Sequence, residues 1–509
     1  MPAESTKPEG AGGHGLLSRE HRNLSIAIYI TIALVAFEGT SVAAALPELA
    51  ADLGDVGRLP WVITAFLFAL GLSTVVAGPL VDAIGSRRLF FWSALAFAIT
   101  GFLAGLAPTL DVLIAIRLAQ GVASGVLFGA TLAAVNLGFP PSLIARAFAA
   151  NSTIWGVVGA AAPAIAAVML SVSSWRWIFF INLPLGAIAL IAGRTAMPER
   201  QPGAEPLSVD VRGVAFAAVF TLASIATVDQ LGAQSLAFAA LAVASVVGYA
   251  RHARRTERPV IALAHIAEQP FRSIAAVPSL MLTAAFTTNV YVTVYVAAGR
   301  DVSNGLAAFS VLFFTIGWTI GANTSSLLMR RTTATSVMSV GLVAGIAGTT
   351  VVVVGVGTNT ALAVAFGGLL ILGVGIGLTT NASLVILRAA TPPAQIGRAS
   401  AANQFARSQG FTLGAASGGA ILLFVVDRRL GSVDPIRTLL SGDELDSSVF
   451  TETAVAEAVR SGFAAATITS LVVMIAAIPA MRSLHRYRAT ENALADWPSA
   501  DDTAGRRIA

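Results

Sequence analysis

The stretch "FPPSLIARAFAAN" at residues 139–151 returns later in the chain as "TPPAQIGRASAAN" at residues 391–403. The two copies share Pro-Pro, Ile, Arg-Ala, Ala-Ala and Asn at a constant offset of 252 positions, the distance from 139 to 391. The same offset matches three upstream residues, Gly121, Val122 and Gly125, with Gly373, Val374 and Gly377. A bias toward Ala and Gly inflates such matches, but chance rarely repeats Pro-Pro together with a spaced Arg and Asn. The sequence therefore predicts an internal duplication that divides the chain into two halves.

The composition places this duplicated chain in a lipid bilayer. Of its 509 residues, 56% are hydrophobic and only 12% are charged, whereas about a quarter of the residues of a soluble domain are charged. Charge-free stretches of about 20 residues recur, which is the length that crosses a hydrocarbon core as a helix. The net charge is +5. In a membrane protein such an excess is expected from Lys and Arg in cytoplasmic loops, so it does not indicate nucleic-acid binding.

The apolar runs predict an all-α integral membrane protein with 14 transmembrane helices. These form two pseudo-symmetric six-helix bundles, with two extra helices between them. The expected spans of the first bundle are 24–47, 60–81, 88–107, 110–136, 145–170 and 175–194. The extra pair covers 212–230 and 234–250. The second bundle covers 273–297, 305–328, 333–356, 361–387, 399–426 and 460–481.

The domain plan follows from these spans and from the placement of the basic residues. It consists of a disordered cytoplasmic tail (1–21), an N-terminal six-helix half (22–196), two linker helices (212–250), a C-terminal half (273–481) with an extracytoplasmic loop (427–459), and a cytoplasmic tail (482–509). Most of the 32 Lys and Arg residues fall on one side when both termini are cytoplasmic. The first 21 residues lack the apolar core of a signal peptide. We expect a multi-pass protein of the plasma (inner) membrane.

Two opposite charges lie at similar depth within apolar spans. At 1.5 Å per residue, Glu38 and Arg117 each lie roughly 10–14 Å from the outer end of the predicted span. Isolated ions are costly in lipid, so we expect each side chain to face the interior and seek the other or water. Two interpretations stay open. The pair either locks the helices together, or Glu38 is a proton carrier, because burial favours its neutral form and Arg117 its charged form.

Two further segments are candidates for a conformational switch. In "GPLVDAIGSRR" (78–88), Gly78 and Gly85 permit close approach and a tight turn. Asp82 is expected at a helix end, held by a dipole or by Arg88, and Arg87 and Arg88 anchor the membrane face. The fifth span presents small residues, among them Gly156 and Gly159, and a bend at Pro163. These features serve either plain packing or a gate between the halves.

Polar side chains in apolar spans are candidates for a substrate cavity, although Asn and Gln also hold helices together. We expect about half of all such polar residues to line a cavity. The predicted cavity residues are Gln120, Asn151, Trp155, Asn289, Tyr291, Tyr295, Asn403, Gln404 and Arg407. Arg407 must pair, reach water or meet an anion, and its counterpart in the duplication is Trp155. The counterpart of Arg117 is Leu369, so the Glu38–Arg117 couple exists only in the first half.

These motifs resemble the major facilitator superfamily and, within it, the 14-helix drug:proton antiporter family of multidrug efflux type, over nearly the whole chain. The family pattern Gly-x-Leu-x-Asp-x-x-Gly-x-Arg-Arg is present as Gly78, Leu80, Asp82, Gly85, Arg87 and Arg88. Its fourth-helix motif is present as Arg117, Gln120 and Gly121, and "WRWIFFINLPLG" (175–186) is similar to the start of the family's sixth helix. Two departures stand out. The fifth-helix motif has Ala at 162, 166 and 167 where Gly is usual, and Glu38 stands where Asp is usual.

The resemblance implies a secondary active transporter that exports hydrophobic or amphipathic small molecules, such as drugs, by proton antiport. In that family the 78–88 element stabilises the outward-open state, and the Arg117 motif is implicated in proton transfer. The same machinery could instead export or import a dedicated metabolite, lipid or siderophore. A membrane enzyme or sensor is remote, because the chain has five His, no Cys and no catalytic or phosphate-binding motif. We expect the protein to use a proton gradient and to need no cofactor or metal. Its expected partners are a small-molecule substrate, protons and the lipid bilayer, and it is expected to be a monomer.

Overall fold

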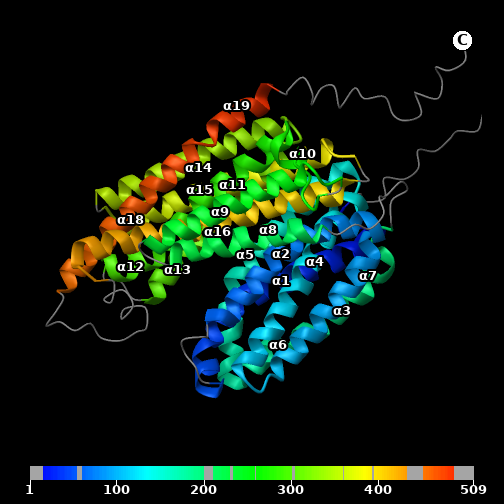
Figure 1. Cartoon of the computed structure of the whole chain (residues 1–509), viewed down its shortest axis with the longest axis horizontal. Coiled ribbons are helices and arrows are strands. Elements are labelled where there is room, and N and C mark those ends of the chain that lie inside the picture. Colours follow the sequence, from blue (N-terminus) through cyan, green and yellow to red (C-terminus); the bar gives the residue numbers. More distant parts are fainter. Residues whose placement is uncertain are drawn as a thin grey trace, which may run out of the picture.

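The computed structural model of the chain describes residues 15–53, 60–199, 210–229, 233–257, 259–300, 304–358, 360–392, 395–432 and 451–486. Within these ranges every regular element is a helix. Figure 1 shows two helical bundles, one blue to cyan and one green to red, whose long axes run side by side. The all-helical class predicted from the sequence is confirmed.

The first bundle comprises α1 (Arg22–Leu53), α2 (Pro60–Ile84), α3 (Ser86–Gly105), α4 (Leu110–Gly138), α5 (Pro141–Val172), α6 (Arg176–Phe180) and α7 (Asn182–Ala196). The connecting pair is α8 (Val211–Asp229) and α9 (Ala233–Ala253). The second bundle comprises α10 (Ala264–Ala267), α11 (Phe271–Asn289), α12 (Val292–Arg300), α13 (Asn304–Leu328), α14 (Ala334–Gly357), α15 (Leu362–Ala389), α16 (Ile396–Leu430), α18 (Glu452–Ile475) and α19 (Ile478–Arg486).

In the described part of the chain, twelve helical segments are long and apolar enough to cross a membrane. The two predicted spans that are not among them, 145–170 and 212–230, are nevertheless helical, as α5 and α8. The count of fourteen spans therefore stays a prediction. Large apolar side chains such as Trp92, Val343 and Leu236 are more than half exposed. A soluble protein would not cover its surface in this way, and lipid explains it.

Helices extend into the predicted loop and into the predicted tail near the C-terminus. Helix α16 continues to Leu430 and α18 begins at Glu452, so both ends of the expected loop 427–459 are helical. Helix α19 also continues to Arg486, into the expected tail 482–509. The sequence did not predict these extensions, because Asp, Glu and Arg near a helix end are also typical of loops outside the membrane. Residues 433–450 and 487–509, and the first 14 residues of the expected tail 1–21, lie outside the described part.

The repeated glycines mark equivalent helix contacts in the two halves. A Cβ on Gly121 would lie 2.4 Å from the Phe66 carbonyl oxygen of α2, and one on Gly373 would lie 2.1 Å from the Phe314 carbonyl oxygen of α13. Gly125 lies equally close to the backbone of α2. Only glycine lets the two backbones approach this closely. The duplication predicted from the sequence therefore corresponds to the same packing of α4 on α2 and of α15 on α13.

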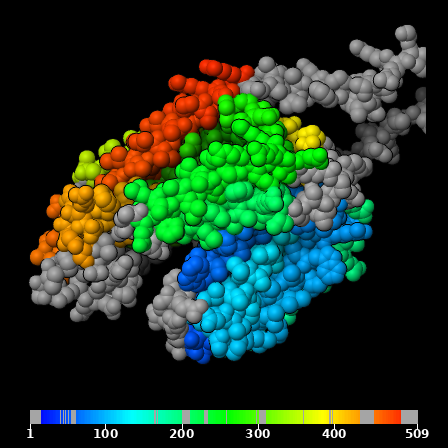
Figure 2. Space-filling model, viewed as in Figure 1, coloured from blue at the N-terminus to red at the C-terminus, as the bar shows by residue number. Residues whose placement is uncertain are grey.

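The two halves meet along two helix pairs. Helix α2 packs along α16, and α5 packs along α13. A Cβ on Gly156 of α5 would lie 2.7 Å from Thr319 Oγ1 of α13, whereas a Cβ on Gly159, one turn further along, would meet no atom within 4 Å. Figure 2 shows the halves in contact at one end and separated by a cleft at the other. We call the closed end the Asp82 end, since it carries Asp82 and the α2–α3 turn.

We predict that Gly125→Ala destabilises the protein, because the added Cβ would lie 2.1 Å from Ser73 Oγ and 2.2 Å from the Leu70 carbonyl oxygen. The expected cost is about 1–3 kcal/mol, measured as a lower unfolding temperature of the detergent-purified protein. Gly159→Ala is the matched control and should be neutral or slightly stabilising, because its Cβ enters open space. Equal effects of the two substitutions would contradict this account of the packing.

Candidate functional site

Glu38 of α1 and Arg117 of α4 form an ion pair inside the N-terminal half. Arg117 Nη1 lies 2.5 Å from Glu38 Oε2, and neither side chain has any exposed surface. The second carboxylate oxygen, Oε1, accepts hydrogen bonds from Gln120 Nε2 at 3.1 Å and from Asn182 Nδ2 of α7. The structure thus brings together the two charges that the depth argument placed at the same level, and surrounds the carboxylate with three donors.

Arg117 has further partners that do not depend on Glu38. Its Nε donates to the Val62 carbonyl oxygen of α2 at 3.1 Å, and its Nη1 also donates to Gln120 Oε1 at 2.8 Å. Its Cζ lies 4.1 Å from the centre of the Phe66 ring, which attracts the cation. If Glu38 becomes neutral, these groups can still hold the guanidinium. The cluster therefore keeps these hydrogen bonds to Arg117 when the carboxylate is neutral, although the buried charge of Arg117 is then unbalanced.

Asn182 is a member of this cluster that the sequence analysis did not single out. It lies in the segment "WRWIFFINLPLG", at the start of α7, where an amide resembles a helix cap. A buried amide in an otherwise apolar helix start was the available signal. Gln120, by contrast, was expected in the substrate cavity. It is fully buried in the ion-pair cluster instead, because it lies one turn from Arg117 on the same face of α4.

The switch candidate Asp82 joins the two halves. Its Oδ2 accepts a hydrogen bond from the Arg398 backbone N–H at 3.2 Å, and the Arg398 Nε lies 3.8 Å away. Arg398 stands in the first turn of α16, so the carboxylate lies at the positive end of that helix. Asp82 was expected to be held by a helix dipole or by Arg88. The dipole is that of α16 in the other half, and the Arg88 side chain is exposed.

The other residues of this element shape the turn and anchor α7. Gly85 has φ 86°, which a residue with a side chain rarely adopts, and Gly78 is buried within α2. Arg87 donates to the Met197 and Thr195 carbonyl oxygens at 2.8 and 3.0 Å and pairs with Glu199. Arg87 therefore neutralises the C-terminal end of α7, within the same half.

Polar bonds near Asp82 reinforce the closed end. Arg388 Nε of α15 donates to the Asn136 carbonyl oxygen of α4 at 3.1 Å, and Asn136 Nδ2 lies 3.5 Å from Ser400 Oγ of α16. Further along, Asn323 Nδ2 of α13 donates to Thr153 Oγ1 of α5 at 2.6 Å. These bonds end near Gly156, where the halves part. The bend expected at Pro163 lies beyond that point, and its side chain is outside the described part.

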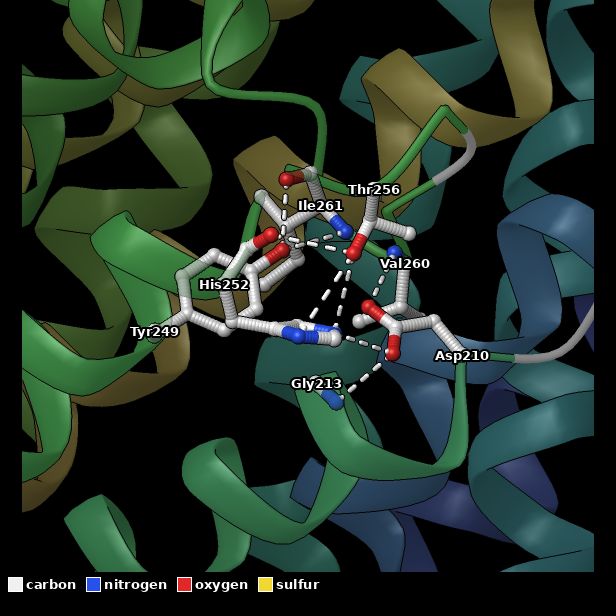
Figure 3. A network of polar contacts seen from close by, with 7 residues as sticks. All are labelled: Asp210, Gly213, Tyr249, His252, Thr256, Val260 and Ile261. Atoms are coloured by element: carbon white, nitrogen blue, oxygen red, sulfur yellow. Dashed lines mark hydrogen bonds and ion pairs between the residues drawn. The ribbon is translucent and has the colours of Figure 1, made fainter. Parts of the chain in front are cut away.

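A polar network, shown in Figure 3, holds the segment that connects α9 to α10, which we call the linker. Asp210 Oδ1 lies 2.7 Å from His252 Nε2 of α9. Tyr249 OH donates to the Ile261 carbonyl oxygen at 2.6 Å and accepts from the Ile261 N–H at 2.9 Å. The side chains of Val260 and Ile261 then pack in one cluster with Val75 of α2 and residues of α16. The linker is thus seated at the α2–α16 seam.

Asp210 is the centre of this network. Burial alone would raise the pKa of its carboxyl, but hydrogen bonds with the Gly213 N–H, His252 and the Val260 N–H outweigh burial and hold the pKa below its usual value. The carboxylate is therefore ionised at neutral pH. It caps α8 through the Gly213 N–H at 2.9 Å, so the same charge orders both the helix start and the linker.

The remaining cavity candidates divide into packed and accessible groups. Tyr295 is buried and stacks on Phe463 with ring centres 4.8 Å apart, and Asn403 is buried against the Ile274 carbonyl oxygen of α11. Tyr291 OH donates to the Ala415 carbonyl oxygen. Tyr295 and Asn403 belong to the packed interior of the C-terminal half, which corrects the prediction for them. In a membrane helix every face is apolar. The sequence therefore does not show whether a polar residue faces the packed interior or the cavity.

The accessible candidates are Trp155 of α5 and Gln404 of α16. Trp155 is 40% exposed and packs its ring against Phe128, and Gln404 is partly exposed. Asn151, Asn289 and Arg407 are buried, and each has side-chain atoms without a hydrogen-bond partner in the described chain. Among the described residues, no three His, Cys, Asp or Glu side chains come close enough to hold a metal ion.

Two helical halves joined by a duplicated plan, with a buried charge pair in one half, define a membrane transporter fold. The family model described as Major Facilitator Superfamily matches residues 28–415. The chain belongs to the major facilitator superfamily, whose members are transporters and not enzymes.

Named relatives within this superfamily include resistance proteins. The chain is 26% identical to the tetracenomycin C resistance and export protein of Streptomyces glaucescens, over 60% of this chain and 58% of that protein. It is 23% identical to the multidrug transporter protein MdtP of Bacillus subtilis, over 78% and 74%. Among solved structures, the human organic anion transporter MFSD10 has a TM-score of 0.60 at 13% identity, covering 89% of this chain and 99% of that one. The chain thus spans less than two thirds of the tetracenomycin exporter.

We predict that Glu38→Gln and Arg117→Gln each destabilise the protein strongly, because each leaves one buried charge without its partner. The expected loss is about 3–5 kcal/mol for each single substitution. The double substitution removes both charges and should recover most of that loss. Unfolding temperatures of the four proteins in detergent measure this cycle. Additive losses in the double variant would show that the two side chains act independently.

We predict that Asp82→Asn loosens the closed end, because the amide loses the charge that faces α16 and Arg398. A loss of about 1.4 kcal/mol corresponds to a tenfold change in population. The chain has no cysteine, so a Cys placed at the buried Ser400 reports opening through its rate of thiol labelling. That rate should rise about tenfold. Asp111→Asn, at the start of α4 within one half, is the control. An unchanged rate for Asp82→Asn would exclude the proposed contact.

Proposed function

We propose that this chain is a proton-coupled exporter of hydrophobic or amphipathic small molecules, in which Glu38 carries the proton. The observation that carries the proposal is the fully buried Glu38–Arg117–Gln120–Asn182 cluster. A carboxylate with no exposed surface, held by three donors, exchanges a proton only when the surrounding helices move. The protonation of Glu38 and the arrangement of the helices are therefore linked.

The two helices that hold Arg117 also hold the seam between the halves. Helix α4 carries Arg117 at one level and Asn136 near the Asp82 end. Helix α2 carries the Val62 carbonyl that accepts from Arg117, and Asp82 at its far end. Because these helices pack backbone to backbone at Gly121 and Gly125, a shift of Arg117 relative to Val62 displaces them together. We infer that this rigid pair transmits protonation of Glu38 to the contacts with α16.

We further propose that the Asp82 end faces the cytoplasm and that fourteen helices cross the membrane, with α5 and α8 as the two additional spans. Arg87, Arg251, Arg254 and Arg255 lie at helix ends on that side, as the positive-inside rule requires. The state described here, closed at the Asp82 end and open at the other, is then outward-open. Both termini are cytoplasmic, the membrane is the plasma (inner) membrane and the protein acts as a monomer without a cofactor.

The relatives support the direction and the class of cargo. The proteins named above are described as a resistance and export protein and as a multidrug transporter. Export by proton antiport draws on ~2.3 kcal/mol per charge per 100 mV of membrane potential, together with the pH gradient. In the proposed cycle, Glu38 gains a proton from outside as substrate leaves and loses it inside as substrate binds. Uptake, or export of a dedicated metabolite, lipid or siderophore, is the alternative outcome of the experiment that follows.

We predict that Glu38→Gln abolishes transport driven by a pH gradient, because an amide cannot lose a proton. Purified protein in liposomes, with an imposed gradient and ethidium, rhodamine B and rhodamine B ethyl ester as probes, measures this. The Glu38→Gln/Arg117→Gln double variant guards against misfolding and should show the same loss. Exchange of dye without a gradient should continue in both variants. Wild-type coupling in either variant would exclude Glu38 as the proton carrier.

A further inference from the structure

Arg407 of α16 is a buried cation to which the described residues supply no ion pair. It is 9% exposed, and its Nε is fully buried with no hydrogen-bond partner in the described part of the chain. Arg117 is equally deep but has Glu38, Gln120 and the Val62 carbonyl. An unpaired charge in a membrane interior is unfavourable and marks a functional position by default. Among the described residues nothing balances the charge of Arg407, which leaves a bound ligand to do so.

The helix places Arg407 on the face that looks across to the other half. Ser400, Gln404, Arg407 and Phe411 follow one another at helical spacings of four, three and four, so they share one stripe of α16. At one end of the stripe Ser400 meets Asn136 of the N-terminal half. Trp155, the counterpart of Arg407 in the duplication, is 40% exposed on α5. Arg407 thus lies one to two turns beyond the closed seam.

Aromatic rings flank Arg407 at the other end of the stripe. Phe411, one turn from Arg407, packs against Phe286 of α11 with ring centres 4.5 Å apart and stacks on Trp318 of α13 at 6.3 Å. Phe314 completes the group at 5.7 Å from Trp318. Phe286, Trp318 and Phe411 are only partly buried. Trp318 Nε1 is itself a buried donor without a partner in the described chain. Arg407 Nε and Trp318 Nε1 are thus two unpaired donors of the described chain that belong to a region with flat apolar surfaces.

We propose that this site binds an amphipathic organic anion. Its acidic group lies on the Arg407 guanidinium, which matches a carboxylate by two parallel hydrogen bonds, with Gln404 as a neighbouring donor. Its apolar body lies against Phe411 and Trp318. The inference rests on the proposed export function and narrows its cargo from any hydrophobic compound to one that carries an acid. An inorganic anion would satisfy Arg407 but would leave the aromatic surface unused.

The test compares two dyes that differ in one group. Rhodamine B carries a carboxylate, and its ethyl ester lacks that charge on the same ring system. Binding to the purified protein, without any gradient, is measured by fluorescence polarisation. Wild type should bind the acid at least about tenfold more tightly than the ester. Arg407→Gln should bring the ratio close to one, and Arg407→Lys should keep part of it. Arg428→Gln, an exposed arginine on the same helix, is the control and should keep the wild-type ratio.

Thermal unfolding separates a binding role from a structural one. Arg407→Gln without dye should unfold no earlier than wild type, because it removes an unbalanced charge. Rhodamine B should raise the unfolding temperature of wild type but not of Arg407→Gln. An acid-to-ester ratio that is unchanged in Arg407→Gln would overturn the proposal. Stabilisation of wild type by chloride, compared with gluconate, and with no preference for the acid dye, would also overturn it and indicate an inorganic anion only.

The outcome for this site is independent of the outcome for export. If the binding ratio depends on Arg407 but no dye moves under a pH gradient, the proposed export function fails and the anion site stands. If dyes move under the gradient with a wild-type ratio in Arg407→Gln, export stands and the anion site fails.

Discussion

The buried pair of Glu38 and Arg117 is the interaction on which the rest of the structure depends. Neither charge is tolerable alone in an apolar interior, so α1, α4 and α7 must supply partners within hydrogen-bond distance of each other. This fixes how the N-terminal half packs. The C-terminal half has Leu369 at the position equivalent to Arg117, inside its hydrophobic core. The duplicated architecture is therefore symmetric in its packing and asymmetric in its chemistry.

This asymmetry gives the two halves different tasks. In the proposed mechanism, the N-terminal half holds Glu38, the group that changes charge, and the C-terminal half holds Arg407, which receives the acidic group of the substrate. Two contacts connect the halves at the closed end. Asp82 of α2 binds the first turn of α16, and the segment held by Asp210 and Tyr249 packs against α2 and α16. A change of charge in one half can alter the other through such shared contacts and through the packed helices that lead to them.

Much of this was readable from the sequence, and the reasons for the failures are physical. The repeat and the apolar runs predicted the grouping of helices, because membrane crossing fixes helix length. The similar depth of Glu38 and Arg117 in their predicted spans indicated that the two side chains could meet. Asn182 was missed because an amide in a helix start resembles a cap, and Arg398 was not recognised as the partner of Asp82 because a contact between halves has no sequence period. Tyr295 was misplaced since a hydroxyl does not show which face is packed.

The central claim, that Glu38 changes protonation as substrate binds, has a direct measurement. Purified protein in weakly buffered detergent solution with a pH indicator receives a dye that it binds, and the pH is followed. Wild type should release protons on binding, and the Glu38→Gln/Arg117→Gln double variant, which lacks the titrating group but keeps the interior neutral, should release none. Equal proton release by both proteins would contradict the account and leave the pair as a structural lock.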